Sequence, residues 1–342
     1  MGFFSFLNQD LAMDLGTANT VIIHNDKVVV NEPSIVAIDR NTNKTVAIGE
    51  IARQMHGKTH DNIRTVRPLR DGVIADFEAA EQMIRGMIKM IPKKNQFFTP
   101  SLRMVIGIPS GSTEVEIRAV RDSADQAGCR EVYLIYEPMA AALGIGVNVE
   151  APIGNMVVDI GGGTTEIAVI ALGGIVCNQS IRVAGDEFTE DIQQYMRQQH
   201  NLKVGERTAE EIKIKVGSAL PELENPPEDF NVRGPNLMTA LPIDVPVNYE
   251  EISSSLDKSL MKIESAIMSV LEQTPPELYA DIVGNGIYLT GGGALLRGLA
   301  KRLKDKINIE FNIVENPLLA VARGTGIAIK NAGRREIPYL FR

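Results

Sequence analysis

Residues 156–170 read MVVDIGGGTTEIAVI, an apolar strand that ends on Asp159, a turn of three glycines and a second apolar strand. Residues 11–23 read LAMDLGTANTVII and repeat this order, with Asp14 just before a glycine turn. The two stretches lie almost half the chain apart. One structural unit written twice predicts a duplicated protein with two lobes.

The elements after each hairpin also repeat in the same order, so both halves read β-β-β-α-β-α-β-α. Three antiparallel strands followed by right-handed crossovers predict two mixed sheets flanked by helices, which is an α/β fold. In the first half we expect strands at 27–30, 103–108 and 131–136 and helices from Asp76, over 112–127 and from Glu137. In the second half we expect strands at 174–183, 286–290 and 309–314 and helices from Asp186, over 294–306 and from Asn316.

Two segments interrupt the duplication and predict small outer subdomains. Residues 33–62 indicate a hairpin across 40–44 and a helix at 50–55. Residues 202–257 indicate a helix at about 209–219, followed by a proline-rich segment that favours edge strands and turns. The expected domains are a first lobe core of 1–32, 63–143 and 316–342 with 33–62 inserted, and a second lobe core of 144–184 and 258–315 with 185–257 inserted.

Several short signals mark the ends of the expected helices. Thr113 with Glu116, and Thr208 with Glu211, have the spacing of capping boxes at helix starts. Gly128 stands where the helix over 112–127 would end.

Composition excludes several classes of protein. The 342 residues carry 35 basic and 43 acidic side chains, and the net charge of −8 argues against a protein built to grip nucleic acid. With 44% hydrophobic and 23% charged residues, the chain is typical of soluble globular proteins. Cys129 and Cys177 are its two cysteines and form no C-x-x-C pair, so we expect neither a disulfide framework nor a cysteine zinc site, and a reducing cytoplasm fits best.

Neither a secretory signal nor a transmembrane helix is expected. Residues 1–7 are apolar but lack a basic region and a cleavage site. The apolar stretch 156–177 contains Asp159, Glu166 and several glycines. We therefore expect a protein that is soluble or at most lies on a membrane surface.

The two hairpin turns predict a site for phosphate and magnesium. A glycine-rich turn lets backbone N–H groups converge on an anion, and the turns 16–19 and 161–164 could hold two sides of one phosphate chain. Asp14 and Asp159 would lie at the mouth of a cleft between the lobes. They are candidates to hold Mg²⁺ through its retained waters, because this cation prefers carboxylate and phosphate oxygens.

A third glycine turn, LTGGGALL at 289–296, ends a strand and opens a helix, which is an anion or nucleotide-edge position. One such turn alone is most often just a tight hairpin. Three turns in symmetric positions favour a joint phosphate site instead. No G-x-x-x-x-G-K-[ST] element occurs, so magnesium and backbone amides would carry the phosphate charge.

These residues resemble the actin, sugar kinase and heat-shock chaperone ATPase superfamily, and within it the bacterial actins of the MreB family. The resemblance covers about residues 8–332 and rests on DLGTANT at 14–20, NEPS at 31–34, RPLRDGVIADF at 67–77, EPMAAA at 137–142, DIGGGTTE at 159–166 and the turn at 289–296. It implies an actin-like ATPase (ribonuclease H-like) fold, with a nucleotide cleft between two duplicated lobes that carry small inserted subdomains.

The resemblance also implies the residues of a site for ATP and Mg²⁺. Phosphate contacts would come from Thr17, Ala18 and Asn19 in one lobe and Gly162, Gly163 and Thr164 in the other. Glu210, Glu211, Ile212 and Lys213 would close over ribose and base, and Gly292, Gly293, Ala294 and Leu295 would border the adenosine. Asp14 and Asp159 would hold the metal through water.

Glu137 matches the family's catalytic glutamate, which orients or deprotonates the attacking water, and Thr164 would position that water. Tyr136 stands where the family commonly has a second glutamate, a departure that bears on the hydrolysis rate. Attack on a γ-phosphoryl group needs positioning and charge neutralisation more than a strong base, so these groups suffice for slow turnover. Nucleotide state would then bias the angle between lobes and the fit of the subunit into a filament.

Two apolar clusters predict membrane docking: Phe3, Phe4, Phe6 and Leu7, and the pair Phe97 and Phe98. In the competing interpretation, the first cluster packs onto its lobe and the pair begins the core face of the next strand. The resemblance favours binding to the inner face of the cell membrane. It also implies paired antiparallel protofilaments and a link to the cell-wall elongation proteins that set rod shape.

Two other classes on the same fold remain as alternatives. A small-molecule kinase needs a substrate-activating base and specificity loops, whereas the insertions here are small and offer no spare aspartate motif. The ATPase lobe of a chaperone would continue into a substrate domain, whereas this chain stops about ten residues after the last expected helix. The filament former is therefore the leading hypothesis.

Overall fold

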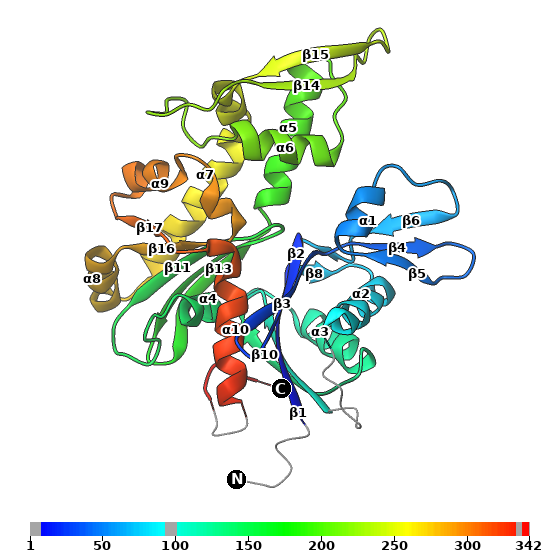
Figure 1. Ribbon diagram of the computed structural model, residues 1–342. Coiled ribbons are helices and arrows are strands. Elements are labelled where there is room, and N and C mark those ends of the chain that lie inside the picture. The colour runs from blue at the N-terminus through cyan, green and yellow to red at the C-terminus, as the bar shows by residue number, and fades with distance from the viewer. Residues whose placement is uncertain (1–7, 93–100, 333–336, 342) are drawn as a thin grey trace.

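The fold is known from a computed structural model, which describes residues 8–92, 101–332 and 337–341. Two lobes stand side by side, each built on a five-stranded mixed sheet, and each carries a smaller subdomain at its outer end (Figure 1). Both the hairpins quoted above are present, with β1 antiparallel to β2 and β11 antiparallel to β12.

The two main sheets have the same topology, which confirms the duplication. Their strand orders are β3-β2-β1-β9-β10 and β13-β12-β11-β16-β17, with an antiparallel trio followed by parallel strands in each. The first sheet contains β1 (Asn8–Leu15), β2 (Asn19–His24), β3 (Lys27–Pro33), β9 (Ser101–Ile108) and β10 (Cys129–Tyr136). The second contains β11 (Asn155–Ile160), β12 (Thr165–Ala171), β13 (Gly174–Ile181), β16 (Ile287–Thr290) and β17 (Phe311–Ile313).

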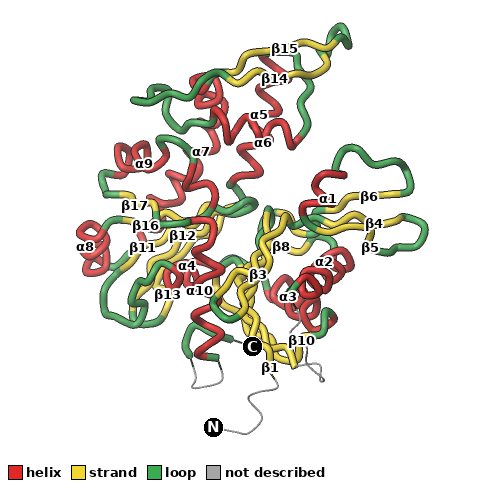
Figure 2. The backbone as a smooth tube through the Cα atoms, viewed as in Figure 1, coloured by secondary structure: helices red, strands yellow, loops and turns green. Residues whose placement is uncertain are grey.

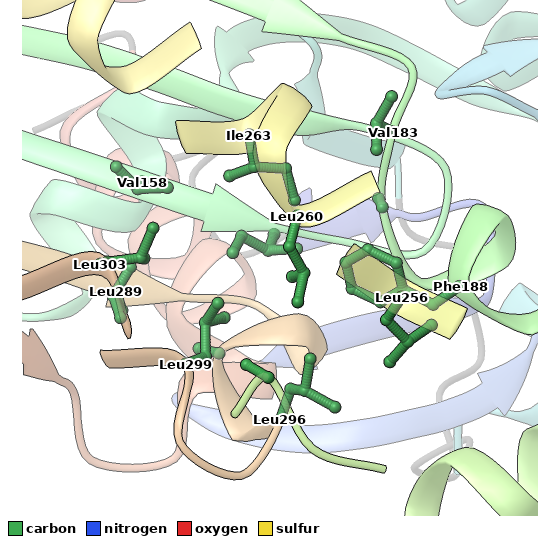
Figure 3. Packing of buried hydrophobic residues seen from close by; sticks show 14 of the residues in the cluster. Val158, Val183, Phe188, Leu256, Leu260, Ile263, Leu289, Leu296, Leu299 and Leu303 are labelled. Carbon is green, nitrogen blue, oxygen red and sulfur yellow. The ribbon is translucent and has the colours of Figure 1, made fainter. Parts of the chain in front are cut away.

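Helices cover both faces of each sheet. The outer face of the first sheet packs on α2 (Phe77–Met90) and α3 (Glu114–Gln126). The outer face of the second packs on α5 (Gly185–Gln199), α7 (Tyr249–Gln273) and α9 (Leu299–Ile307), where leucines of α7 and α9 meet Val158 and Leu289 of the sheet (Figure 3). A further helix, α8 (Pro276–Asn285), connects α7 to β16.

Two helices lie between the sheets and join the lobes. They are α4 (Glu137–Gly144), after which the chain enters the second lobe, and α10 (Ala320–Asn331), in which it returns. One apolar core contains residues of both helices and of the inner faces of both sheets. Glycines let the helices cross in contact, because a Cβ on Gly144 would lie 1.9 Å from the carbonyl oxygen of Ala320.

The outer subdomains follow the two expected insertions (Figure 2). The first is a three-stranded sheet with one helix: β4 (Val36–Asp39), β5 (Thr45–Ile48), β6 (Ile63–Val66) and α1 (Glu50–Met55). A two-stranded hairpin, β7 (Leu69–Arg70) with β8 (Val73–Ile74), follows it. The second subdomain has α6 (Glu206–Val216) and the two-stranded ribbon of β14 (Phe230–Pro235) and β15 (Pro242–Val247). The expected boundary at 257–258 falls inside α7.

Several local predictions are confirmed. One predicted capping box and the starts of two helices are wrong. The capping box of Thr113 with Glu116 is present, and Gly128 has φ of 104° just after α3. The box of Thr208 with Glu211 is wrong, because α6 begins at Glu206 and Thr208 lies inside its first turn.

The helix expected over 294–306 is interrupted. A short 3₁₀ helix, η2 (Gly292–Leu295), is followed by Gly298 with φ of 75°, and α9 starts only after this left-handed residue. Similarly, the helix expected from Asn316 begins as a 3₁₀ turn, η3 (Pro317–Leu319), before α10.

No helix within the described ranges has both the length and the apolar character needed to cross a bilayer. The residues predicted to dock on a membrane, namely Phe3, Phe4, Phe6, Leu7, Phe97 and Phe98, lie outside the described residues.

Candidate nucleotide-binding site

The glycine turns of the two lobes face each other. A Cβ on Gly162 would lie 2.8 Å from the Cβ of Ala18, and one on Gly163 would lie 2.7 Å from Oγ1 of Thr17. These distances leave no space for a side chain at position 162 or 163. Both positions therefore require glycine. The hydroxyl of Thr17 also accepts a hydrogen bond from the backbone of Gly72 at 3.0 Å, which fixes the turn of the first lobe.

Four carboxylates converge beside these turns; we call Asp14, Glu137, Asp159 and Glu166 the carboxylate cluster. Side chains alternate along a strand, so Asp14 shares a face of β1 with Ala12, and Asp159 shares a face of β11 with Val157. Ala12 and Val157 both belong to the core between the sheets. Glu166 pairs with Asp159 across β11 and β12, and Glu137 begins α4 between the sheets.

The cluster is electrostatically unfavourable without a cation. Burial, with the nearby charge of Asp159, raises the pKa of Asp14 to about 7. Burial also raises the pKa of Asp159 to about 6, against the hydrogen bond from Thr290 that favours its charged form. The pKa of Glu137 is raised by burial first and then by the charges of the other three carboxylates.

These side chains fit a hard divalent cation. The side chains of Asp14 and Glu137 make no hydrogen bond or ion pair with any residue that the structure describes, while the side chain of Asp159 accepts one bond from Thr290 Oγ1 at 2.7 Å. No three His, Cys, Asp or Glu side chains of the described chain form a ready metal cage. Carboxylate oxygens that do not surround a metal completely are suited to Mg²⁺, because this cation keeps several of its water ligands.

The third glycine turn lies against the end of β11. A Cβ on Gly291, which has φ of 79°, would lie 2.8 Å from Oδ1 of Asp159, and one on Gly293 would lie 2.2 Å from Cγ2 of Ile160. Ala294 is buried and Leu295 is 55% exposed, so of the predicted residues here Leu295 offers the open apolar surface. The turn therefore borders the cluster from the second lobe.

Helix α6 reaches the same place through part of the predicted segment. The Nζ of Lys213 donates to the carbonyl oxygen of Gly185 at 2.7 Å and pairs with Glu210 at 2.6 Å. Gly185 in turn donates its backbone N–H to Gly161 in the glycine turn. Ile212 points instead into the core of the second lobe, and Glu211 is bonded to Arg207 on the surface.

Sequence reasoning missed an ion-pair network between the lobes. Arg67 of the first lobe pairs with Asp186 at the start of α5 at 2.9 Å and with Glu206 at the start of α6. Its side chain is 23% exposed. Arg67 was visible within RPLRDGVIADF, but no pattern in the sequence indicated its partners more than 100 positions away.

Glu166 was missed as well. It is fully buried and accepts hydrogen bonds from Ser110 and Ser180. The signal in the sequence is a single charged residue inside an otherwise apolar strand, which marks a residue with a polar partner.

Comparisons with known proteins indicate one family along almost the whole chain. The model of the MreB/Mbl protein family matches residues 8–336. The chain is 46% identical over 324 residues to cell shape-determining protein Mbl of Bacillus subtilis strain 168, which covers 94% of this chain and 96% of that protein. It is 48% identical over 333 residues to cell shape-determining protein MreB of Escherichia coli K12, covering 96% and 95%.

Solved structures give the same answer for the fold. The crystal structure of MreB 5 of Spiroplasma citri bound to AMPPNP matches with a TM-score of 0.89 and 38% identity, over 96% of this chain and 97% of that one. The ADP-bound form of MreB5 matches with the same score. The chain therefore belongs to the MreB/Mbl family of cell shape-determining proteins and has their actin-like ATPase fold.

Proposed function

We propose that this chain binds ATP with Mg²⁺ between its lobes, hydrolyses it slowly and uses the bound nucleotide to regulate its assembly into filaments. One observation carries the proposal: the glycine turns of the two lobes face each other beside the carboxylate cluster. The relative from Spiroplasma citri, crystallised with AMPPNP and with ADP, supports nucleotide binding by this chain.

The phosphates would bind to backbone N–H groups of both lobes. Thr17, Ala18 and Asn19 would supply one side, and Gly162, Gly163 and Thr164 the other. The turns touch in this structure, so a nucleotide would have to part them and would then connect the lobes. Nucleotide state would thereby control the angle between the lobes.

Mg²⁺ would be held through water by Asp14 and Asp159. When bound, it supplies positive charge that offsets both the carboxylates and the phosphates. The raised pKa values of these two aspartates support this assignment, because a bound cation would offset the cost of burying their charged forms.

Hydrolysis would depend on one residue from each lobe. The carboxylate of Glu137, which bonds to no described residue, would orient the attacking water or accept its proton, and its raised pKa makes it a stronger base. Thr164 would position the same water from the second lobe, where it lies beside Gly72. Phosphoryl transfer to water depends mainly on positioning and charge neutralisation. These two groups, together with Mg²⁺, are therefore expected to suffice for slow hydrolysis.

The rest of the nucleotide would extend toward the second subdomain. Glu210 and Lys213 of α6 are suited to polar contact with the ribose, and Leu295 to apolar contact with the base. Gly292, Gly293 and Ala294 would shape that edge through their backbone. Glu211 and Ile212 would act by holding α6 in place, since one is on the surface and the other in the core.

In the cell, we propose that the protein forms homopolymers of paired antiparallel protofilaments on the inner face of the cytoplasmic membrane, where they organise cell-wall elongation. The cell shape-determining role of its relatives supports the part of this proposal that concerns cell shape. Residues 1–32, 63–143 and 316–342 would then move as one lobe with subdomain 33–62, and 144–184 and 258–315 as the other with subdomain 185–257.

Assembly and nucleotide binding can be tested together. Calorimetric titration with ATP and Mg²⁺ should release heat, and light scattering and pelleting should rise with protein concentration in the same buffer. A small-molecule kinase or a chaperone lobe would bind ATP without pelleting. Absence of both heat and thermal protection by ATP would contradict the nucleotide site itself.

Membrane binding has a separate test. Liposome co-sedimentation should fall when Phe97→Ser and Phe98→Ser are combined with removal of the first seven residues. Unchanged binding would exclude these two clusters as the membrane contact.

A further inference from the structure

Glu166 lies at a contact between the lobes that the chemistry above does not use. Its carboxylate accepts hydrogen bonds from the backbone N–H of Ser110 at 2.9 Å and from the Oγ of Ser110 at 2.5 Å, both on Oε2. Its other oxygen accepts one from the Oγ of Ser180 at 2.5 Å. Within the described chain, Glu166 forms no ion pair, so these three donors are what satisfy a fully buried carboxylate.

This Ser110–Glu166–Ser180 bridge connects the two lobes. Ser110 belongs to the turn between β9 and α3 of the first lobe, whereas Glu166 and Ser180 stand on β12 and β13 of the second. The approach is close along the turn, because a Cβ on Gly111 would lie 2.9 Å from the Cβ of Ser180. The bridge is therefore a tie between the lobes in addition to helices α4 and α10.

Both proposed catalytic residues lie beside this bridge. Gly107 of β9, three residues before Ser110, is the position at which an added Cβ would lie 3.6 Å from Cγ of Glu137. On the other side, a Cβ on Gly72 would meet both Thr164 at 2.7 Å and Pro109 at 2.9 Å. The turn that Glu166 holds thus follows the strand that contacts Glu137, and it packs on Gly72, which also contacts Thr164.

We propose that Glu166 is a positioning residue for ATP hydrolysis: by holding the turn at Ser110 against the second lobe, it fixes the spacing between Glu137 and Thr164. The inference rests on the proposed function. These two residues come from different lobes, so their spacing depends on how the lobes are tied together. An error of about 1 Å in such a spacing costs roughly 100-fold in rate.

A purely structural role would lower stability without affecting turnover, and matched variants separate the two. Ser110→Ala and Ser180→Ala each remove one hydroxyl donor to Glu166. Ser259→Ala is the control, because Oγ of Ser259 also donates to a carboxylate, that of Asp191, at 2.5 Å, but joins α7 to α5 inside the second lobe. Each variant loses one hydrogen bond between a hydroxyl and a carboxylate.

We expect the three serine variants to lose similar thermal stability but to differ in steady-state ATPase kinetics. Ser110→Ala should lower kcat roughly 10-fold or more with KM within about 3-fold, while Ser259→Ala stays within about 2-fold in both. Glu166→Gln should retain more turnover than Glu166→Ala, because its amide oxygen still accepts from the Ser110 N–H. Hydrogen exchange at the Ser110 amide should be faster in Glu166→Ala.

The possible failures are distinguishable. If the unmodified protein turns over no ATP, the proposed function falls and the positioning role falls with it. If the unmodified protein is active, but Ser110→Ala and Glu166→Ala lose no more kcat than Ser259→Ala, only the positioning role is overturned.

Discussion

Gly324 of α10 lies against the backbone of Ala140 in α4, because a Cβ on this glycine would be 1.7 Å from the carbonyl oxygen of Ala140. With the reciprocal contact of Gly144 on Ala320, this makes the joint between the lobes a crossing of two helices at backbone distance. Any relative movement of the lobes must therefore either shift α4 against α10 at this crossing or pivot about it.

Gly324→Ala should therefore destabilise the protein by about 2–4 kcal/mol, because the helices must move apart and leave gaps in the core. Gly326→Ala, on the same helix, is the control. Its Cβ would find its nearest neighbour, Cγ2 of Ile23, at an ordinary 3.4 Å, so it should be neutral or stabilise by about 0.5–1 kcal/mol through helix propensity. Denaturant unfolding measures both, and equal stability of the two variants would contradict the tight crossing.

The network of Arg67 predicts control over nucleotide exchange. Arg67→Ala removes the pairs with Asp186 and Glu206 between the lobes, so a bound nucleotide should dissociate about 3- to 10-fold faster. Stopped-flow displacement of a fluorescent ATP analogue measures this rate. The rate of the unmodified protein should also rise with salt more steeply than that of the variant.

Arg233→Ala is the matched control for that experiment, since Arg233 pairs with Asp244 at 2.7 Å within the exposed ribbon of β14 and β15. It should leave the dissociation rate unchanged. A rate for Arg67→Ala equal to that of this control would mean that the pairs between the lobes do not hold them closed.

Much of this architecture could be predicted because its signals are local. The hairpins after Asp14 and Asp159 combine strand periodicity with glycine turns, and their repetition indicated both sheets. Residues that act across the lobes are different. Arg67 and Glu166 have partners set by the packing of whole lobes, which no spacing along the chain encodes. The wrong start of α9 has a similar cause, since the left-handed Gly298 stops the helix where periodicity alone continues it.

The carboxylate cluster predicts the behaviour of Glu137. Glu137→Gln removes the general base and one charge of the cluster but keeps the size of the side chain. ATP affinity should stay within about 3-fold or improve slightly, while single-turnover hydrolysis should slow by about 100-fold or more. Glu150→Gln, a change of the same kind at an exposed position, should alter neither. Full turnover by Glu137→Gln would remove this residue from the mechanism.

The same cluster predicts an unusual dependence of stability on pH. The pKa of Asp14 is raised from its ordinary 3.8 to about 7 in the folded protein. Between these values the folded state binds the proton more tightly than the unfolded state, so the metal-free protein should lose stability as pH rises from about 4 to about 7. Asp14→Asn removes this penalty and should stabilise the metal-free protein by roughly 1–3 kcal/mol at about pH 8 and by little at about pH 4.

Magnesium with ATP should reverse the order of the two proteins. The unmodified chain gains stability from the bound complex at high pH, whereas Asp14→Asn has lost a carboxylate for the metal and should gain less. Thermal unfolding with and without Mg²⁺ and ATP at both pH values measures this, with Asp305→Asn on the exposed side of α9 as the control. If Asp14→Asn were no more stable than Asp305→Asn without metal, the charged form of Asp14 would not be penalised by burial and by the charge of Asp159. If it also gained full protection from the nucleotide complex, Asp14 would have no part in holding the metal.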